Sequence, residues 1–171
     1  RLVQMTSIND LLDTAKMMEG TKDAILIGRP DFSNSKFADL KATEAEVKNI
    51  GNVLGKSGFE SRYLIHDAAQ ESTIKSIQKF PRVIHFATHG YFNDEQEEQS
   101  IINYMLQSGI VLSTNNQSGE DGILTAYEMT NLNMEKTELV VLSACETGLG
   151  KVESREGVYG LQRAIHIAGA K

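Results

Sequence analysis

Three short, continuously apolar segments rich in β-branched residues constrain the fold of this chain more than any other feature. They read AILIG, VIHFAT and LVVLS, and they begin at Ala24, Val83 and Leu139. A strand with one face in water alternates apolar and polar side chains, whereas a strand covered on both faces reads as an unbroken apolar run. The three segments therefore predict a mostly parallel central sheet with helices on both faces.

The rest of the chain completes an α/β pattern. Five helices are predicted from apolar residues at helical spacing behind a capping residue, and they start at Ser7, Thr43, Asp67, Thr125 and Ser154. The spacings Thr43-x-x-Glu46 and Thr125-x-x-Glu128 are those of capping boxes, and the third helix is expected to extend to Phe80. The predicted strands are Ala24–Gly28, Arg62–Ile65, Arg82–Thr88, Gly109–Leu112 and Leu139–Ser143.

Strand–helix–strand order of this kind predicts a three-layer α/β sandwich, with residues 1–171 forming a single domain. Asn93–Ser100 and Ser113–Asp121 are predicted to be polar loops. The chain stops at Lys171, directly after the fifth predicted helix, where a doubly wound order calls for another strand. We therefore expect the domain to be incomplete on its C-terminal side.

Composition excludes several classes of function. A net charge of −6 argues against nucleic-acid binding, which is driven by clustered basic residues. The apolar runs are too short for a membrane span, and the first residues lack the pattern of a signal peptide, so no membrane contact is expected. The single cysteine, Cys145, cannot form an intrachain disulfide and fits a reducing compartment, so a cytoplasmic location is expected.

Two nucleotide-site motifs and one metal motif fail on mechanism. Gly51–Ser57 is one residue short of a phosphate-binding loop and lies at a helix C-terminus, whose dipole repels phosphate. Gly150-Lys151 is followed by Val152, which has no hydroxyl for Mg²⁺. His85 and His89 have zincin spacing, but on a strand they stand about 13 Å apart. No cofactor and no metal are therefore expected.

The four histidines differ in their positions. His85 lies in the middle of an apolar run and is interpreted as a buried, hydrogen-bonded core residue. His66 is interpreted as a turn residue, and His166 as an exposed residue of the last helix. His89 follows the end of a predicted core strand and precedes Gly90, where ligands of open parallel sheets bind. His89 is therefore the candidate for function.

Cys145 occupies an equivalent position, two residues beyond the strand that ends at Ser143. A lone cysteine is most often inert core filling. Here, however, the one cysteine and one histidine both follow core strands, and His89 precedes Cys145 by 56 residues. Caspase-type peptidases have the same order, with the histidine ~50 residues upstream.

Two blocks of sequence carry a family resemblance. VIHFATHGYF at 83–92 and LVVLSACETGLG at 139–150 resemble the histidine and cysteine blocks of CHAT peptidases, which are relatives of caspases and separases. Further similar blocks extend through nearly the whole chain: MTSINDLL at 5–12, LIGRPDF at 26–32, ATEAEVKNIGNVL at 42–54, DGILTAYEMTNLNM at 121–134 and EGVYGLQRAIHIAGA at 156–170.

The resemblance implies an intracellular cysteine endopeptidase that cleaves a protein or peptide substrate. Cys145 would be the nucleophile and His89 its acid–base partner, and the backbone N–H groups of Gly90 and Cys145 would form the oxyanion hole. No third orienting residue is evident, so a dyad is predicted. The family also implies activation by a partner or by a neighbouring TPR-like helical-repeat region.

Two other classes of function stay open at this point. One is a catalytically silent scaffold with a caspase-like fold, and the other is a small-molecule hydrolase or transferase that uses the same thiol. Substrate preference is open too. Glu120, Asp121 and the acidic run at 94–98 fit a basic substrate residue, but solvated loops are the favoured interpretation.

Overall fold

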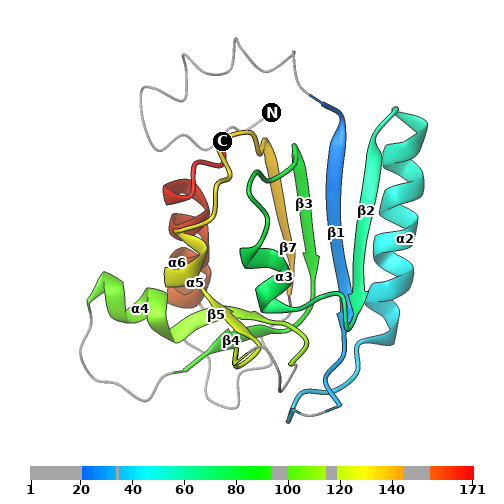
Figure 1. The fold of residues 1–171 in the computed structure, drawn as a ribbon. Helices are drawn as coiled ribbons and strands as arrows, with labels where there is room; N and C mark the ends of the chain where they lie inside the picture. The colour runs from blue at the N-terminus through cyan, green and yellow to red at the C-terminus, as the bar shows by residue number, and fades with distance from the viewer. Residues whose placement is uncertain (1–20, 34, 94–99, 115–118, 145–154) are drawn as a thin grey trace.

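The apolar strands form one parallel sheet. The computed structural model describes residues 21–33, 35–93, 100–114, 119–144 and 155–171. Within these, the sheet has the order β2-β1-β3-β7, and every pairing is parallel (Figure 1). Its strands are β1 (Asp23–Pro30), β2 (Glu60–His66), β3 (Val83–Ala87) and β7 (Leu139–Ser143). The predicted mostly parallel central sheet is confirmed.

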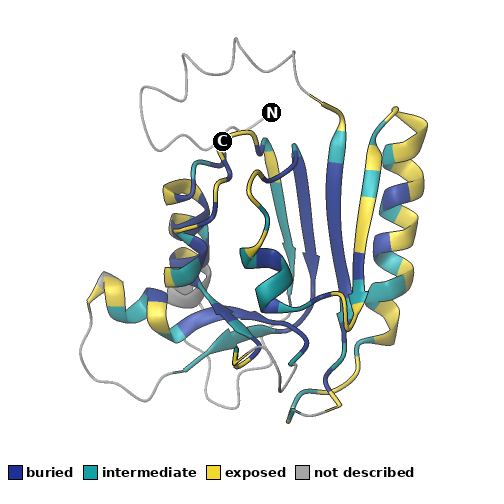
Figure 2. Ribbon diagram, viewed as in Figure 1, coloured by how far each residue is buried: buried dark blue, intermediate teal, exposed yellow. Residues whose placement is uncertain are grey.

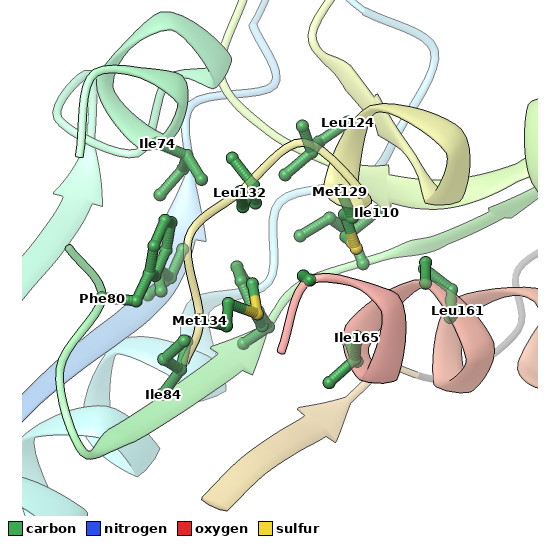
Figure 3. Packing of buried hydrophobic residues seen from close by; sticks show 14 of the residues in the cluster. Ile74, Phe80, Ile84, Ile110, Leu124, Met129, Leu132, Met134, Leu161 and Ile165 are labelled. Atoms are coloured by element: carbon green, nitrogen blue, oxygen red, sulfur yellow. The ribbon is translucent and has the colours of Figure 1, made fainter. Parts of the chain in front are cut away.

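Both faces of this sheet are covered. On one face the strands pack against α2 (Lys41–Lys56), with Val47 at the centre of a cluster that includes Leu26 and Val83. On the other face, Ile84 and its neighbours join a larger cluster under α3 (Glu71–Lys75), α5 (Ala126–Met129) and α6 (Arg155–Ile167), as Figure 3 shows. The predicted three-layer sandwich is therefore confirmed.

Burial on both faces explains the unbroken apolar runs. The central strands β1 and β3 are almost completely buried, whereas β2 and β7 at the edges are partly exposed (Figure 2). Gly28 of β1 illustrates how closely the layers approach. A Cβ atom there would lie 2.8 Å from the carbonyl oxygen of Thr43 and 2.9 Å from a methyl group of Val47. Glycine at this position lets α2 pack directly on the sheet.

A second, antiparallel sheet stands beside the carboxyl edge of the first. It has the order β4-β5-β6, formed by β4 (Gly90–Phe92), β5 (Ser108–Val111) and β6 (Ile123–Thr125). The strand predicted at Gly109–Leu112 exists as β5, but it belongs to this sheet rather than to the central one. The sequence pattern does not predict β4, β6 or the helix α4 (Ile101–Gln107), because they are too short to show a clear period of apolar residues. The helix α4 begins behind a Ser100 cap.

Of the predicted helix starts, the one at Thr125 is confirmed. The Thr125 hydroxyl accepts from the Glu128 N–H and the Glu128 carboxylate accepts from the Thr125 N–H, which completes a capping box. The predicted starts at Ser7 and Ser154 lie outside the described residues.

The Thr43 capping box is wrong. The helix begins at Lys41, and its N-cap, Leu40, makes no side-chain cap. The Thr43 hydroxyl donates to the Leu40 carbonyl and accepts from the Arg29 N–H, at 2.8 Å each. Glu46, the expected partner in that box, instead contacts His85 at 2.8 Å.

The third helix also differs from the prediction. It covers Glu71–Lys75 rather than starting at Asp67 and extending to Phe80. Residues after β2 form a turn in which the Ala69 N–H donates to the His66 carbonyl, and the Ala69 carbonyl accepts from Ser113. Because this turn and the tertiary hydrogen bond from Ser113 occupy the backbone, the helix starts later.

A partly buried ion cluster joins α3 to α5. The Lys75 Nζ lies 2.6 Å from Glu71, 3.0 Å from Glu120 and 2.9 Å from Glu128. Glu71 is only 2% exposed and also accepts from the Gly122 N–H. Burial raises the pKa of Glu71 to about 7, although Lys75 opposes this shift. The folded protein therefore holds this proton more tightly than the unfolded chain.

The cluster predicts a pH-dependent loss of stability in Lys75→Met. Removing one partner of a buried charge costs roughly 3 kcal/mol, the low end of the usual range because Lys75 is 30% exposed. The loss should be larger at about pH 8, where Glu71 is an anion, than at about pH 5.5, where it carries a proton. Urea unfolding at both pH values measures the difference.

Lys48→Met is the matched control, because Lys48 pairs with Glu44 at 2.6 Å but is 56% exposed. That variant should lose no more than about 0.5 kcal/mol. Equal losses for the two variants, or a Lys75→Met loss that does not change with pH, contradict the account of the cluster.

Candidate active site

The candidate catalytic residues follow neighbouring strands at the carboxyl edge of the parallel sheet. Ala87 of β3 pairs with Ser143 of β7. His89 and Cys145 each stand two positions beyond this pair in sequence. Cys145 itself lies outside the described residues, so its role as nucleophile stays a prediction.

His89 is held in place by the loop that follows β1. Its side chain is nearly buried, with 4% exposed. The ring centroid lies 5.1 Å from that of Phe32 and 5.4 Å from that of Phe37. The ring Nε2 is 2.8 Å from the backbone carbonyl oxygen of Ala38. One loop thus supplies both the aromatic contacts and the hydrogen bond that orient the imidazole.

The hydrogen bond to Ala38 selects a tautomer. A backbone carbonyl can only accept, so Nε2 must carry the proton that it donates. In the neutral ring the other nitrogen, Nδ1, is then the one that can take up a proton. The sequence predicted no third orienting group, and the structure supplies a backbone carbonyl, which has no side-chain signal in a sequence.

The end of β3 is anchored to the second sheet. The hydroxyl of Thr88 donates to the Val111 carbonyl, and the Val111 N–H donates to the His89 carbonyl at 2.9 Å. Gly90 starts β4, paired with Ile110. Gly90 does not use the positive φ that glycine allows. The oxyanion-hole roles of Gly90 and Cys145 stay predictions.

The other histidines have partners and surroundings different from those of His89. The interpretation of His85 as a buried core histidine is confirmed, since it is 5% exposed and contacts Glu46 on α2. His166 is exposed, as predicted. His66 ends β2 with a φ of +52° and lies 3.5 Å from Glu44. His85 and His89 bond to different partners, so their H-x-x-x-H spacing makes no shared ligand position.

A pocket opens beside the histidine, where the end of β1 and the loop that follows it meet His66 at the end of β2. Its volume is about 340 Å³, and its walls include Phe32, Phe37, Asp31, Asp39 and His66. Arg29, also in the wall, bonds to Asp39 and Glu44 at 2.9 Å each. Hydrogen bonds to Glu44 from Lys48, and to a smaller extent from Arg29, lower the pKa of Glu44 to about 2. No sequence pattern predicts this pocket, because its residues from β1 and the following loop meet His66 of β2 only in the folded chain.

Among the described residues, one group of carboxylates is close enough to share a metal ion. Oxygens of Glu71, Glu120 and Glu128 lie within 4.8 Å of one another. The Lys75 ammonium already contacts all three, so it supplies the positive charge that this cluster requires.

Comparison with protein-family models shows the family to which this chain belongs. The family model described as CHAT domain matches residues 1–171, the whole chain. The chain belongs to the CHAT domain family. The resemblance drawn from the histidine and cysteine blocks is thereby confirmed. None of the curated proteins compared with the chain matches it.

Membership of the CHAT family agrees with the fold described above. The family is related to the cysteine peptidases, and the sandwich built on the β2-β1-β3-β7 sheet is caspase-like. In the part of this CHAT domain that the structure describes, the helices are too short or too polar to cross a membrane.

The Ala38 contact predicts a defined tautomer for His89. In mildly alkaline solution, ¹⁵N-detected NMR of the histidine-labelled CHAT domain should show His89 protonated on Nε2, with slow solvent exchange of that proton. The exposed His166 serves as the control and should exchange rapidly. A His89 ring protonated on Nδ1 contradicts the assigned hydrogen bond.

Proposed function

We propose that this CHAT domain is a cysteine endopeptidase in which Cys145 attacks the substrate and His89 moves the proton. The observation that supports it best is the fixed imidazole of His89, oriented by Ala38, at the edge where β7 leads toward the lone cysteine. Carboxyl edges of parallel sheets are where ligands of α/β proteins bind.

The first half-reaction forms an acyl-enzyme. A thiol with an ordinary pKa of ≈ 8.5 is only a few per cent thiolate at neutral pH, so it needs a base. Nδ1 of His89 takes the proton of Cys145, and the sulfur forms a bond to the carbonyl carbon of the scissile peptide. The resulting oxyanion returns its electron pair, the C–N bond breaks, and His89 protonates the departing amine. A thioester and a free amine remain.

The second half-reaction restores the enzyme. His89 takes a proton from water as the water oxygen attacks the thioester carbonyl. The C–S bond then breaks, the carboxylic acid leaves, and the proton returns to the sulfur of Cys145. Proton transfer by a positioned group of this kind contributes typically 10²–10⁴-fold in rate.

The backbone N–H groups of Gly90 and Cys145 complete the proposed mechanism by binding the oxyanion. A donor of this kind contributes about 2.7–4 kcal/mol to transition-state stabilisation. Support for Gly90 comes from its position directly after His89, at the start of β4. A residue without a side chain leaves room for the substrate carbonyl to approach the backbone.

Regulation and location belong to the same proposal. The peptidase acts on a protein or peptide in the cytoplasm, where a reducing environment keeps Cys145 as a thiol. A partner or a TPR-like helical-repeat region switches it on. The near-complete burial of His89, at 4% exposure, supports such control, because substrate access then requires a rearrangement.

The same burial favours one alternative function. In a catalytically silent scaffold, His89 would serve only to hold the loop after β1 against β3 through Ala38 and the two phenyl rings. Only a peptidase has a cleavage activity that is lost when Cys145 or His89 is substituted, so single variants distinguish the two functions.

Peptide cleavage by the intact protein tests the proposal. With a mixed library of internally quenched peptides, Cys145→Ala should abolish turnover and His89→Ala should lower it by about 10²–10⁴-fold. Iodoacetamide should still label Cys145 in His89→Ala, because the thiol itself remains. His166→Ala, an exposed histidine on α6, is the matched control and should keep full activity. Cleavage that survives in Cys145→Ala rejects Cys145 as the nucleophile, whereas an intact protein that cleaves none of the peptides favours the silent scaffold.

A further inference from the structure

The pocket formed by the loop after β1 and by His66 at the end of β2 shares two walls with the candidate catalytic histidine. Phe32 and Phe37 line the pocket, and the same two rings pack against His89. A volume of about 340 Å³ is at the small end for ligand pockets, which are typically ≈ 300–1,000 Å³. The pocket is therefore suited to one side chain of a peptide that lies across His89.

Charge in this pocket is predominantly negative. Arg29 is occupied, since its guanidinium bonds to both oxygens of Asp39 and to Glu44. Asp31 differs, because within the described part of the chain no lysine or arginine forms an ion pair with it. Hydrogen bonds from the Ser33 N–H and hydroxyl lower the pKa of Asp31, so this carboxylate is charged at neutral pH.

The loop after β1 and the end of β2, which form the pocket, are both fixed by a buried serine. Ser113, which is 3% exposed, accepts from the Asp31 N–H at 2.8 Å and donates to the His66 carbonyl. The Ser113 N–H donates to the Ala69 carbonyl. Ser113, a single residue that follows β5, therefore links the ends of β1 and β2. The position of Asp31 is thus set before any ligand arrives, which lowers the entropy cost of binding.

We propose that this pocket binds a basic side chain of the peptide substrate, within about three residues of the bond that is cut, given ~3.3 Å per extended residue. The inference rests on the proposed peptidase function. Phe32 and Phe37 would flank the alkyl chain, and Asp31 would accept from the guanidinium or ammonium group. The Phe37 ring already lies under a cation, the Lys36 ammonium, 5.9 Å from its centroid.

The acidic residues near Gly122 fit this role less well. Glu120 is bound to Lys75 at 3.0 Å, and Asp121 accepts from the Ile123 N–H in a turn. Neither lines the pocket beside His89. Asp121 nevertheless offers a matched control, because its turn has the same form as that of Asp31 with Ser33.

Binding and cleavage of paired peptides test the proposal. The peptides come from a library of pairs. The two members of a pair differ at a single position, which is arginine in one and citrulline, a neutral side chain of the same shape, in the other; the position differs from pair to pair. Intact protein should cleave the arginine member of one pair about 10-fold faster, the effect of one charge-assisted hydrogen bond. Asp31→Asn should lose most of this preference, whereas Asp121→Asn should keep it.

The Cys145→Ala form separates the two proposals, because it binds without cutting. Fluorescence anisotropy should show tighter binding of the arginine peptide to this form, and weaker discrimination in the double variant with Asp31→Asn. If the arginine peptide binds preferentially but the intact protein never cleaves it, the pocket stands and the peptidase fails. Equal binding of arginine and citrulline peptides, or no binding of either, overturns the pocket assignment.

Discussion

Burial of β1 and β3 on both faces is the constraint on which the rest of the structure depends. Ile84 and Phe86 point into the cluster under α3, α5 and α6, while Val83 and Ala87 point toward α2. Strands covered in this way pair in parallel, so their carboxyl ends meet along one edge. His89 and the pocket beside it both lie at that edge.

The carboxyl edge of the sheet places His89 where a catalytic site can form, but it does not by itself orient the imidazole. For His89 the orientation comes from the loop after β1, through two phenyl rings and the Ala38 carbonyl. That loop is in turn tied to Ser113, two residues beyond β5, and the end of β3 is tied to β5 through Val111. The small antiparallel sheet therefore supports the candidate site, although it lies outside the central sheet.

Much of this architecture could be predicted from the sequence, because patterns of burial are local. The runs AILIG, VIHFAT and LVVLS revealed the buried strands, and the histidine and cysteine blocks revealed the CHAT relationship. Tertiary contacts account for most of the errors. Thr43 bonds to Arg29 rather than to Glu46, and Glu46 is taken by His85, so the capping box that their spacing indicated never forms.

Other features had no local signal at all. The carbonyl of Ala38 belongs to an ordinary residue, and the ion cluster joins Lys75 to Glu128, which lies 53 positions away in the sequence. The central claim is that the thiol of Cys145 and Nδ1 of His89 exchange a proton. A crystal structure of the intact protein, trapped at Cys145 by a peptide ketone, measures it most directly. The account predicts Sγ within hydrogen-bonding reach of Nδ1, with Nε2 still on Ala38; a sulfur buried among apolar side chains, far from the ring, contradicts it.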